Sequence, residues 1–271
     1  MKESANNLNI KSNGIEVCYN DAGSSVIPII FIHGFPFDKS TWNPQIDYLK
    51  NTNRVISYDN RGFGKSEKGG DDLSINLFAD DLINLMDSLK IKKAIVCGLS
   101  MGGYILLNAI NRYKDRFHAI ILCDTQCIAD TEEGKAKRFN TIKLIEDGGI
   151  KEFTEGFLKN IFCSESLENK PALVEKIKTL ILSVKPESIT AALKALANRV
   201  ETCSMLSKVK VPAMIICGKE DKVTPAPQSE FMHDKIIGSE LHIIESAGHM
   251  SNLEQPEIFN NHLENFIKKI S

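Results

Sequence analysis

The sequence predicts an α/β fold in which a mostly parallel central sheet is flanked by helices. Short, continuous apolar runs recur along the chain, as expected for strands that are buried on both faces. Amphipathic segments separate these runs, and their apolar residues recur at the three- and four-residue spacing of helices. The 271 residues are enough for one large α/β unit that carries an inserted subdomain.

The chain opens with a predicted hairpin around Asn13 and Gly14, a dipeptide typical of two-residue turns. A helix is predicted over residues 74–89, where apolar side chains follow helical periodicity. The apolar runs that we interpret as the remaining strands cover residues 27–32, 54–59, 93–98, 118–124, 212–218 and 240–246. Strands that alternate with helices in this way indicate parallel neighbours in one sheet.

One interval interrupts the alternation, because residues 130–206 contain amphipathic stretches and no strand pattern. Pro171 and Pro186 punctuate the stretches, and proline is favoured in the first turn of a helix. We therefore expect three to five helices, inserted after the sixth strand, that can roof a pocket. The predicted organisation is a core of residues 1–129 and 207–271 with this interval as a helical cap.

Composition and charge exclude several classes of partner. The net charge of −2 argues against a phosphate-binding surface and hence against nucleic acid. No run approaches 18 apolar residues and residues 1–10 lack an apolar core, so we expect neither a membrane span nor a signal peptide. The seven scattered cysteines predict reduced, buried thiols of a cytoplasmic protein. Cys123 and Cys127 lack the second ligand pair that zinc needs, so we expect no metal.

Residues 98–102, Gly-Leu-Ser-Met-Gly, match the pattern G-x-S-x-G between a predicted strand and a helical segment. A sharp turn at this place would lift the Ser100 hydroxyl above the carboxyl edge of the sheet, and glycines would leave room for it. A serine that merely caps a helix is the simpler interpretation. The functional interpretation therefore depends on a base, an acid and oxyanion donors elsewhere in the chain.

His249 is the predicted base, because it follows the last strand and so lies at the carboxyl edge of the sheet. His33 also follows a strand, but we interpret it as part of a turn. Asp221 follows the strand over residues 212–218 and is the favoured acid. Asp124 is the alternative acid, since it also ends a strand at this edge.

An oxyanion hole needs two backbone N–H groups directed at the developing alkoxide. Met101, directly after the serine, is expected to supply one of them. The other is expected from Phe35 in the loop after strand 27–32, since the following Pro36 has no N–H to donate.

The chain resembles the α/β-hydrolase superfamily from about residue 28 to residue 269. The segments that carry the resemblance are FIHGFPFDKSTW, YDNRGFGKS, VCGLSMGG, CGKEDKVTP and AGHMSNLEQP. Within the superfamily, GLSMGG and CDTQCIADTEEGKAKR resemble the branch of 3-oxoadipate enol-lactonase-like hydrolases, carboxylesterases and cofactor-free haloperoxidase-like esterases. The resemblance implies an α/β-hydrolase fold with its helical cap.

For function, the resemblance implies an ester or lactone hydrolase with Ser100, Asp221 and His249 as its triad, in the chain order of the superfamily. It implies Phe35 and Met101 as oxyanion donors. A serine at the nucleophile position argues against the dehalogenases and epoxide hydrolases of the superfamily. The predicted mechanism needs no metal or organic cofactor.

We predict a carboxylesterase that acts on a small ester, because the predicted cap is more apolar than basic. An enol-lactonase-like lactone hydrolase is the alternative, and its substrate would need a cationic partner. Arg138 and Arg199 are candidates, although we interpret both as solvated helix residues. A ligand receptor on the same fold and a perhydrolase are further alternatives, and the sequence does not indicate substrate-binding residues or an oligomeric state.

The stretch RGFGKS over residues 61–66 contains the Gly-Lys-Ser end of a nucleotide-binding loop. Asp59 stands where that pattern requires glycine, and no long helical pattern begins at Lys65. We expect a structural loop that Asp59 and Arg61 anchor by hydrogen bonds.

Overall fold

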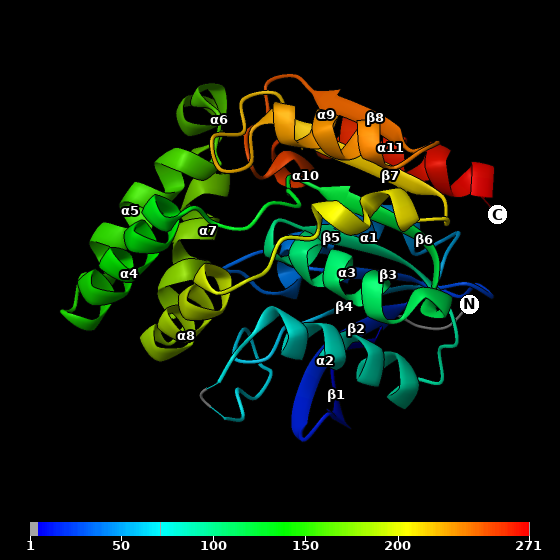
Figure 1. Cartoon of the computed structure of the whole chain (residues 1–271), viewed down its shortest axis with the longest axis horizontal. Coiled ribbons are helices and arrows are strands. Elements are labelled where there is room, and N and C mark those ends of the chain that lie inside the picture. The colour runs from blue at the N-terminus through cyan, green and yellow to red at the C-terminus, as the bar shows by residue number, and fades with distance from the viewer. Residues whose placement is uncertain (1–4, 71, 271) are drawn as a thin grey trace.

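The computed structural model describes residues 5–70 and 72–270. Residues 1–4, which belong to the segment that we expect not to be a signal peptide, lie outside the described residues. It contains an eight-stranded sheet with the order β1-β2-β4-β3-β5-β6-β7-β8 (Figure 1). The strands are β1 (Ala5–Ser12), β2 (Ile15–Ala22), β3 (Ile29–Ile32), β4 (Val55–Tyr58), β5 (Ala94–Leu99), β6 (Phe117–Cys123), β7 (Ala213–Gly218) and β8 (Glu240–Ile244).

The predicted hairpin and the predicted parallel strands are confirmed. β1 and β2 pair antiparallel around Asn13 and Gly14, whose φ angles of 46° and 77° suit a two-residue hairpin turn. β2 is also antiparallel to β4, and every pair from β4 to β8 is parallel. The carboxyl ends of six strands therefore meet at one edge of the sheet.

Helices cover both faces of the sheet, which explains why the inner strands β3 to β7 are largely apolar and buried. The helices of the core are α1 (Asn43–Leu49), α2 (Ile75–Ser88), α3 (Met101–Arg112), α9 (Ala226–Lys235), α10 (Ser251–Glu254) and α11 (Pro256–Ile270). In β3, Ile30 and Ile32 pack in the hydrophobic cluster that includes α2, α3 and α9. Ile29 and Phe31 point the other way, into the cluster that includes α1 and α11.

Between β6 and β7 the described residues form helices and no strand, as the sequence predicts. These are α4 (Glu132–Glu146), α5 (Ile150–Ile161), α6 (Ser164–Asn169), α7 (Pro171–Ser183), α8 (Pro186–Ala197) and the short 3-10 helix η3 (Cys203–Lys208). Pro171 and Pro186 occupy the first positions of α7 and α8. Figure 1 shows α4 to α8 grouped at the end of the molecule away from the C-terminal end of α11.

The loop after β4 is anchored as predicted. Both Asp59 carboxylate oxygens accept hydrogen bonds, from the Lys39 backbone N–H (2.9 Å), from the Lys65 backbone N–H (2.9 Å) and from the Lys39 ammonium group (2.7 Å). Arg61 donates from Nε and Nη2 to the two carboxylate oxygens of Asp81, at 2.8 and 2.7 Å. Both residues of this second pair are buried.

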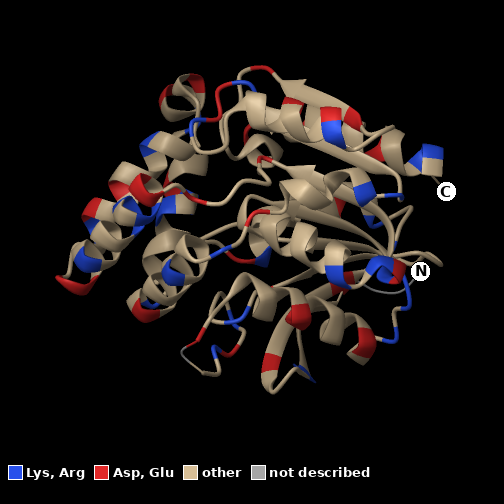
Figure 2. Cartoon of the chain, viewed as in Figure 1, with Lys and Arg blue, Asp and Glu red and all other residues tan. Residues whose placement is uncertain are grey.

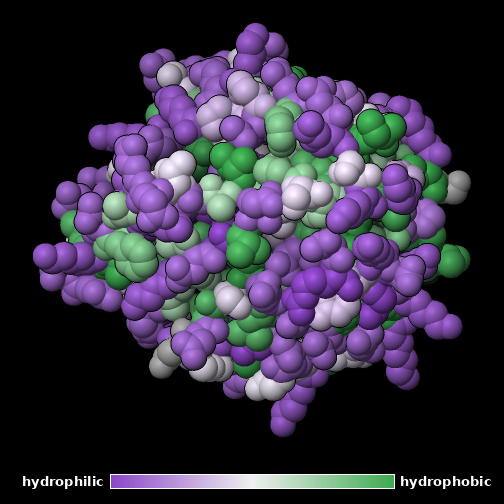
Figure 3. Space-filling view, in the orientation of Figure 1, coloured by the Kyte–Doolittle hydropathy of each residue, from purple (hydrophilic) through white to green (hydrophobic). Residues whose placement is uncertain are grey.

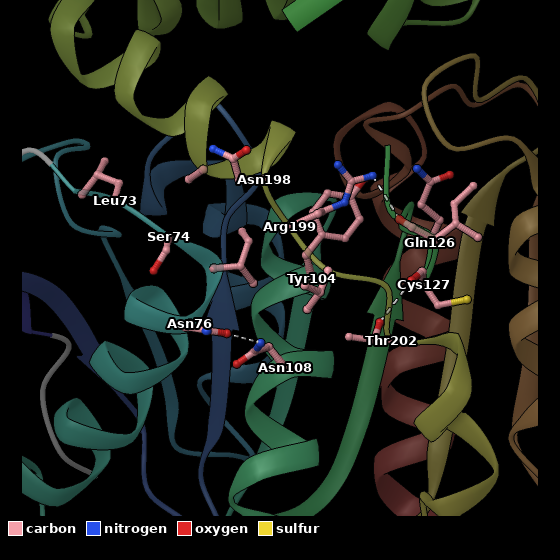
Figure 4. Close-up of a pocket in the computed structure, with 14 residues that line it drawn as sticks. Leu73, Ser74, Asn76, Tyr104, Asn108, Gln126, Cys127, Asn198, Arg199 and Thr202 are labelled. Atoms are coloured by element: carbon pink, nitrogen blue, oxygen red, sulfur yellow. Dashed lines mark hydrogen bonds between the residues drawn. The ribbon is translucent and has the colours of Figure 1, made fainter. Parts of the chain in front are cut away.

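The expectation that the cysteines are all reduced is wrong for two of them. Cys127, just after β6, forms a disulfide with Cys203, at the start of η3, 76 residues along the chain. The other five cysteines are free and buried. The spacing of the sequence does not indicate this pair, because the whole cap lies between the two cysteines along the chain. The two ends of the cap meet in space, and this brings the two cysteines together. Figure 4 shows Cys127 beside Thr202, whose backbone N–H donates to the Cys127 carbonyl oxygen at 2.8 Å.

The surface carries charges of both signs. Figure 2 shows acidic and basic residues interleaved along the cap helices α4 and α5. The face seen in Figure 3 is mostly hydrophilic, with hydrophobic residues gathered in small patches. Within residues 5–70 and 72–270, no helix combines the length and the apolar character that crossing a membrane requires.

Candidate active site

Ser100 occupies a tight turn between β5 and α3. Its φ of 52° and ψ of −113° are unfavourable for a residue with a side chain, and such strain requires about 1–3 kcal/mol from the surrounding structure. The flanking glycines make the turn possible. A Cβ at Gly98 would lie 2.3 Å from the Gly102 carbonyl oxygen, and a Cβ at Gly102 would lie 2.4 Å from the Ile32 carbonyl oxygen. The glycines of the motif are thus required for close backbone packing.

Asp221 and His249 are in direct contact at the carboxyl edge of the sheet. The His249 Nδ1 atom lies 2.7 Å from Asp221 Oδ2, and both residues are buried. The other carboxylate oxygen, Oδ1, accepts from the backbone N–H groups of Val223 (2.7 Å) and Thr224 (2.9 Å). This contact sets Nδ1 as the protonated nitrogen and leaves Nε2 as the acceptor.

The electrostatics of this pair favour its charged form. Burial acts to lower the pKa of His249, but the charge of Asp221 and its hydrogen bond raise it above its ordinary value. Burial acts to raise the pKa of Asp221, but His249 and Thr224 hold it below its ordinary value. The carboxylate is therefore ionised and able to stabilise a protonated imidazole.

Ser100 and His249 line the same cavity, of about 490 Å³. The Ser100 hydroxyl makes no hydrogen bond to the His249 ring in the part of the chain that the structure describes. Contacts of this kind are often long without substrate and shorten when it binds. The two side chains thus face one space, with Asp221 behind the ring.

The N–H groups expected to hold an oxyanion are unengaged. Met101 is the first residue of α3, so its N–H has no partner within the helix. Among the described residues, neither this N–H nor that of Phe35 donates a hydrogen bond. Both residues line the cavity beside Ser100.

The structure separates the two candidate acids. Asp124 is fully buried and makes no hydrogen bond to His249 in the described chain. Its carboxyl group instead accepts from the Gly218 backbone N–H at 2.8 Å and from the Ser251 hydroxyl at 2.5 Å. Of the two, Asp221 is the one that touches the imidazole.

His33, the other histidine at this edge, belongs to a turn, as predicted. Its Nδ1 lies 2.8 Å from the Gly34 carbonyl oxygen, and its Nε2 accepts from the Asn60 backbone N–H at 2.9 Å. Burial, the largest effect, lowers the pKa of His33. Both ring nitrogens are occupied, so His33 has no free nitrogen for proton transfer.

Glu254 was missed by sequence reasoning. Its buried carboxylate oxygen Oε1 accepts from the backbone N–H groups of Gly248 (2.8 Å) and Met250 (3.3 Å), the two neighbours of His249. The His249 N–H donates to the Ile161 carbonyl oxygen of the cap at 2.8 Å. Nothing in the spacing of the sequence distinguishes this glutamate from an exposed one.

The cavity has an aromatic wall. Phe35 from the core meets Phe153 and Phe157 from α5, with ring centroids 6.4 and 6.1 Å away, and these two stack at 5.4 Å. Of the cap phenylalanines, Phe153 and Phe157 thus line the cavity. Phe139 is instead exposed, and Phe162 is buried in the core. Tyr104 also lines the cavity and was not anticipated, although it lies one helical turn after Ser100.

Three cationic residues also line the cavity: Lys137, Arg138 and Lys222. Arg138 forms an ion pair with Asp130, which also lines the cavity and pairs with Arg199 at 2.7 Å. Burial opposes ionisation of Asp130, but the two arginines hold its pKa below the ordinary value. One carboxylate thus faces two guanidinium groups, which leaves an excess of positive charge.

The interpretation of Arg199 as a solvated helix residue is wrong. It is buried, and its guanidinium carbon lies 4.5 Å from the centre of the Tyr104 ring (Figure 4). It also donates to the carbonyl oxygens of Leu196 (2.9 Å) and Ile128 (3.1 Å). The Asp130 partner lies 69 residues earlier in the chain, so the sequence did not indicate this pairing.

Comparisons with known proteins agree with this geometry. Residues 27–256 match the family model described as alpha/beta hydrolase fold. 3-oxoadipate enol-lactonase 2 of Acinetobacter baylyi is 29% identical over 90% of this chain and 89% of its own. The structure of an esterase from Thermogutta terrifontis superposes with a TM-score of 0.92 at 31% identity, covering 99% of both chains. The enol-lactonase from Burkholderia xenovorans gives a TM-score of 0.90 at 27% identity, covering 96% of this chain and all of that one.

Proposed function

Because the chain belongs to the alpha/beta hydrolase fold family, we propose that it is a serine hydrolase that cleaves a small carboxylic ester through an acyl-enzyme. The observation that carries the proposal is the 2.7 Å contact between His249 and Asp221 in a cavity shared with Ser100. A serine becomes nucleophilic when a neighbouring imidazole accepts its proton, and a carboxylate keeps that imidazole in the required tautomer.

In the proposed reaction, the Ser100 oxygen attacks the ester carbonyl carbon while His249 Nε2 takes the hydroxyl proton. The N–H groups of Phe35 and Met101 donate to the negatively charged oxygen of the tetrahedral intermediate. His249 then gives its proton to the leaving alcohol. Water, deprotonated by the same nitrogen, releases the acid and restores the Ser100 hydroxyl.

The aromatic wall of Phe35, Phe153 and Phe157 supports an ester with an apolar acyl or alcohol part. A cavity of about 490 Å³ suits a small-molecule substrate. The structural similarity to an esterase at 31% identity supports the same class of reaction.

A lactone hydrolase is the second candidate, and the cationic lining of the cavity favours it. Arg138, Lys137 and Lys222 could neutralise a carboxylate on the substrate, and the two enol-lactonases compared above support this class. The variant Arg138→Gln separates the candidates. It should raise KM for a carboxylate-bearing ester and leave KM for a neutral ester of the same length unchanged if the substrate is anionic.

The first test is hydrolysis of p-nitrophenyl acetate and butyrate by wild type and Ser100→Ala, with fluorophosphonate labelling of both proteins. The proposal expects turnover and labelling in the wild type and neither in the variant. Equal behaviour of the two proteins, without labelling, would contradict it. Such a result would favour a ligand receptor on the same fold. That alternative predicts that a small molecule binds without turnover and that the cap rearranges on binding.

A further inference from the structure

Asp124 has an unusual environment for a group without a place in the proposed reaction. It follows β6, is 0% exposed and adopts a φ of 43°, a left-handed backbone that a side chain disfavours. Its two carboxyl oxygens each accept one hydrogen bond, from the Gly218 N–H at 2.8 Å and from the Ser251 hydroxyl at 2.5 Å. A strained and fully buried carboxyl group with complete hydrogen bonding requires a structural reason at this position.

The two partners of Asp124 belong to the loops that carry the proposed acid and base. Gly218 ends β7 and its carbonyl oxygen accepts from the Asp221 N–H at 3.3 Å. Ser251 begins α10, two residues after His249. One carboxyl group therefore joins the loop of Asp221 to the loop of His249.

The neighbours of Asp124 hold the serine in the same way. The Ser100 N–H donates to the Cys123 carbonyl oxygen at 2.9 Å. The Thr125 hydroxyl donates to the Ser100 carbonyl oxygen at 2.8 Å. Three consecutive residues, 123–125, thus bind the segments that carry Ser100, Asp221 and His249.

The raised pKa of Asp124 agrees with a geometric role. Burial, and next the charge of Asp221, raise the pKa of Asp124 well above its ordinary value. A neutral carboxyl group keeps both contacts: one oxygen accepts from Gly218, and the O–H donates to the Ser251 oxygen. An asparagine amide has the same shape and could make the same two contacts, with its oxygen on Gly218 and its N–H on Ser251.

We propose that Asp124 is a positioning residue that fixes the Asp221 and His249 loops to the end of β6. The inference rests on the proposed hydrolase function for its effect on turnover. It differs from a role as the alternative acid in one respect: it needs the shape and hydrogen bonds of the side chain and not its charge. Replacement by asparagine therefore distinguishes the two roles.

The test compares Asp124→Asn, Asp124→Ala and Ser251→Ala with Asp221→Asn as the reference for a lost acid. Turnover of p-nitrophenyl butyrate is measured from pH 5 to pH 9, as kcat and KM. Hydrogen exchange is followed in peptides covering residues 216–224 and 247–254. Ser251→Ala removes the contact between the Ser251 hydroxyl and Asp124, and it replaces Asp124→Ala in the comparison if that variant does not fold.

Asp124→Ala is expected to lower kcat by about 100-fold, the loss typical of a misplaced reacting group. KM should stay unchanged because Asp124 does not line the cavity. Exchange should become faster in both peptides. Asp124→Asn should rescue kcat to within about tenfold of wild type with an unchanged pH profile, whereas Asp221→Asn should lose about 10⁴-fold.

Two results would overturn the inference: a loss in Asp124→Asn as large as in Asp221→Asn, or wild-type kcat and exchange in both Asp124→Ala and Ser251→Ala. A wild-type protein without turnover would overturn the proposed function instead. In that case the exchange of the two peptides still decides whether Asp124 holds the loops.

Discussion

Reduction of the Cys127–Cys203 disulfide is expected to destabilise the fold while leaving the sheet edge intact. The bond closes a loop with a sequence separation of 76 residues. For a loop of this length, the restriction of the unfolded chain contributes about 4.5 kcal/mol to the free energy of unfolding in the chain-entropy model, and measured effects are typically about 2–4 kcal/mol. For a chain of 271 residues, such a change lowers Tm by about 4–8 °C.

The native state should change less than the unfolded state, because other contacts also join the two ends of the cap. Thr202 donates to the Cys127 carbonyl oxygen at 2.8 Å, and Arg199 donates to Asp130 at 2.7 Å. Turnover by the reduced protein at 25 °C should therefore equal that of the oxidised protein, although its free energy of unfolding is lower.

The assay is urea unfolding followed by the fluorescence of Trp42, the single and fully buried tryptophan, with and without a phosphine reductant. Cys203→Ser is the control, because reductant should not change its unfolding. Thiol titration in denaturant should give five free thiols before reduction and seven after it. Seven thiols before reduction, or equal free energies of unfolding in both states, would refute the reasoning.

The remaining predictions concern the site and the core. His249 acts as a base only when it is unprotonated, and its pKa is raised above the ordinary histidine value of 6.5. The midpoint of the acid limb of the kcat/KM profile should therefore lie above pH 6.5, and a midpoint below pH 6.5 would contradict this assignment. Gly102→Ala puts a Cβ 2.4 Å from a β3 carbonyl oxygen, so thermal melting should show a free energy of unfolding lower by about 1–3 kcal/mol. Labelling by a fluorophosphonate should be lost in the same variant. Gly156→Ala is the control, because its Cβ would enter open space and should change neither measurement. Arg61→Met leaves the buried Asp81 carboxylate without its charge partner and should lower the free energy of unfolding by about 3–5 kcal/mol, with partial recovery on adding Asp81→Asn. An unchanged urea midpoint for Arg61→Met would show that the pair is not stabilising.

Most of the fold could be predicted from short patterns in the sequence. The apolar runs of β3 to β7 became strands that are almost entirely buried, because parallel strands between two helical layers tolerate few polar residues, whereas β8 at the edge of the sheet is only partly buried. The turn at Ser100 was predictable because close packing against Ile32 admits only glycine at position 102. In these cases the signal lies within a few neighbouring residues, even where the packing partner, as for Gly102, is distant in the chain.

Contacts between distant segments were harder to predict. Asp124 and Asp221 both follow strands at one edge of the sheet, and only the spatial structure shows that His249 reaches Asp221. The interpretation of Arg199 as a solvated residue fails because its partner Asp130 lies at the other end of the cap, where the sequence gives no sign of the pairing. Such pairings depend on how the cap folds back, for which neither periodicity nor motif spacing carries a signal.

The direct pairing of β6 with β7 has a consequence for how this molecule can diversify. Ile120 to Cys123 lie opposite Ala213 to Ile216, so residues 124–212 are an excursion between two adjacent strands. The sheet places no limit on the length or sequence of such an excursion beyond its first and last residues. A different set of helices could be exchanged at this junction, altering which molecules enter the cavity while Ser100 stays directly after β5 and Asp221 stays in the loop after β7. In the proposed reaction, the reacting side chains thus lie outside the excursion and much of the cavity lining lies within it, with the bond from the His249 N–H to the Ile161 carbonyl oxygen as a link that an exchanged set of helices would have to keep.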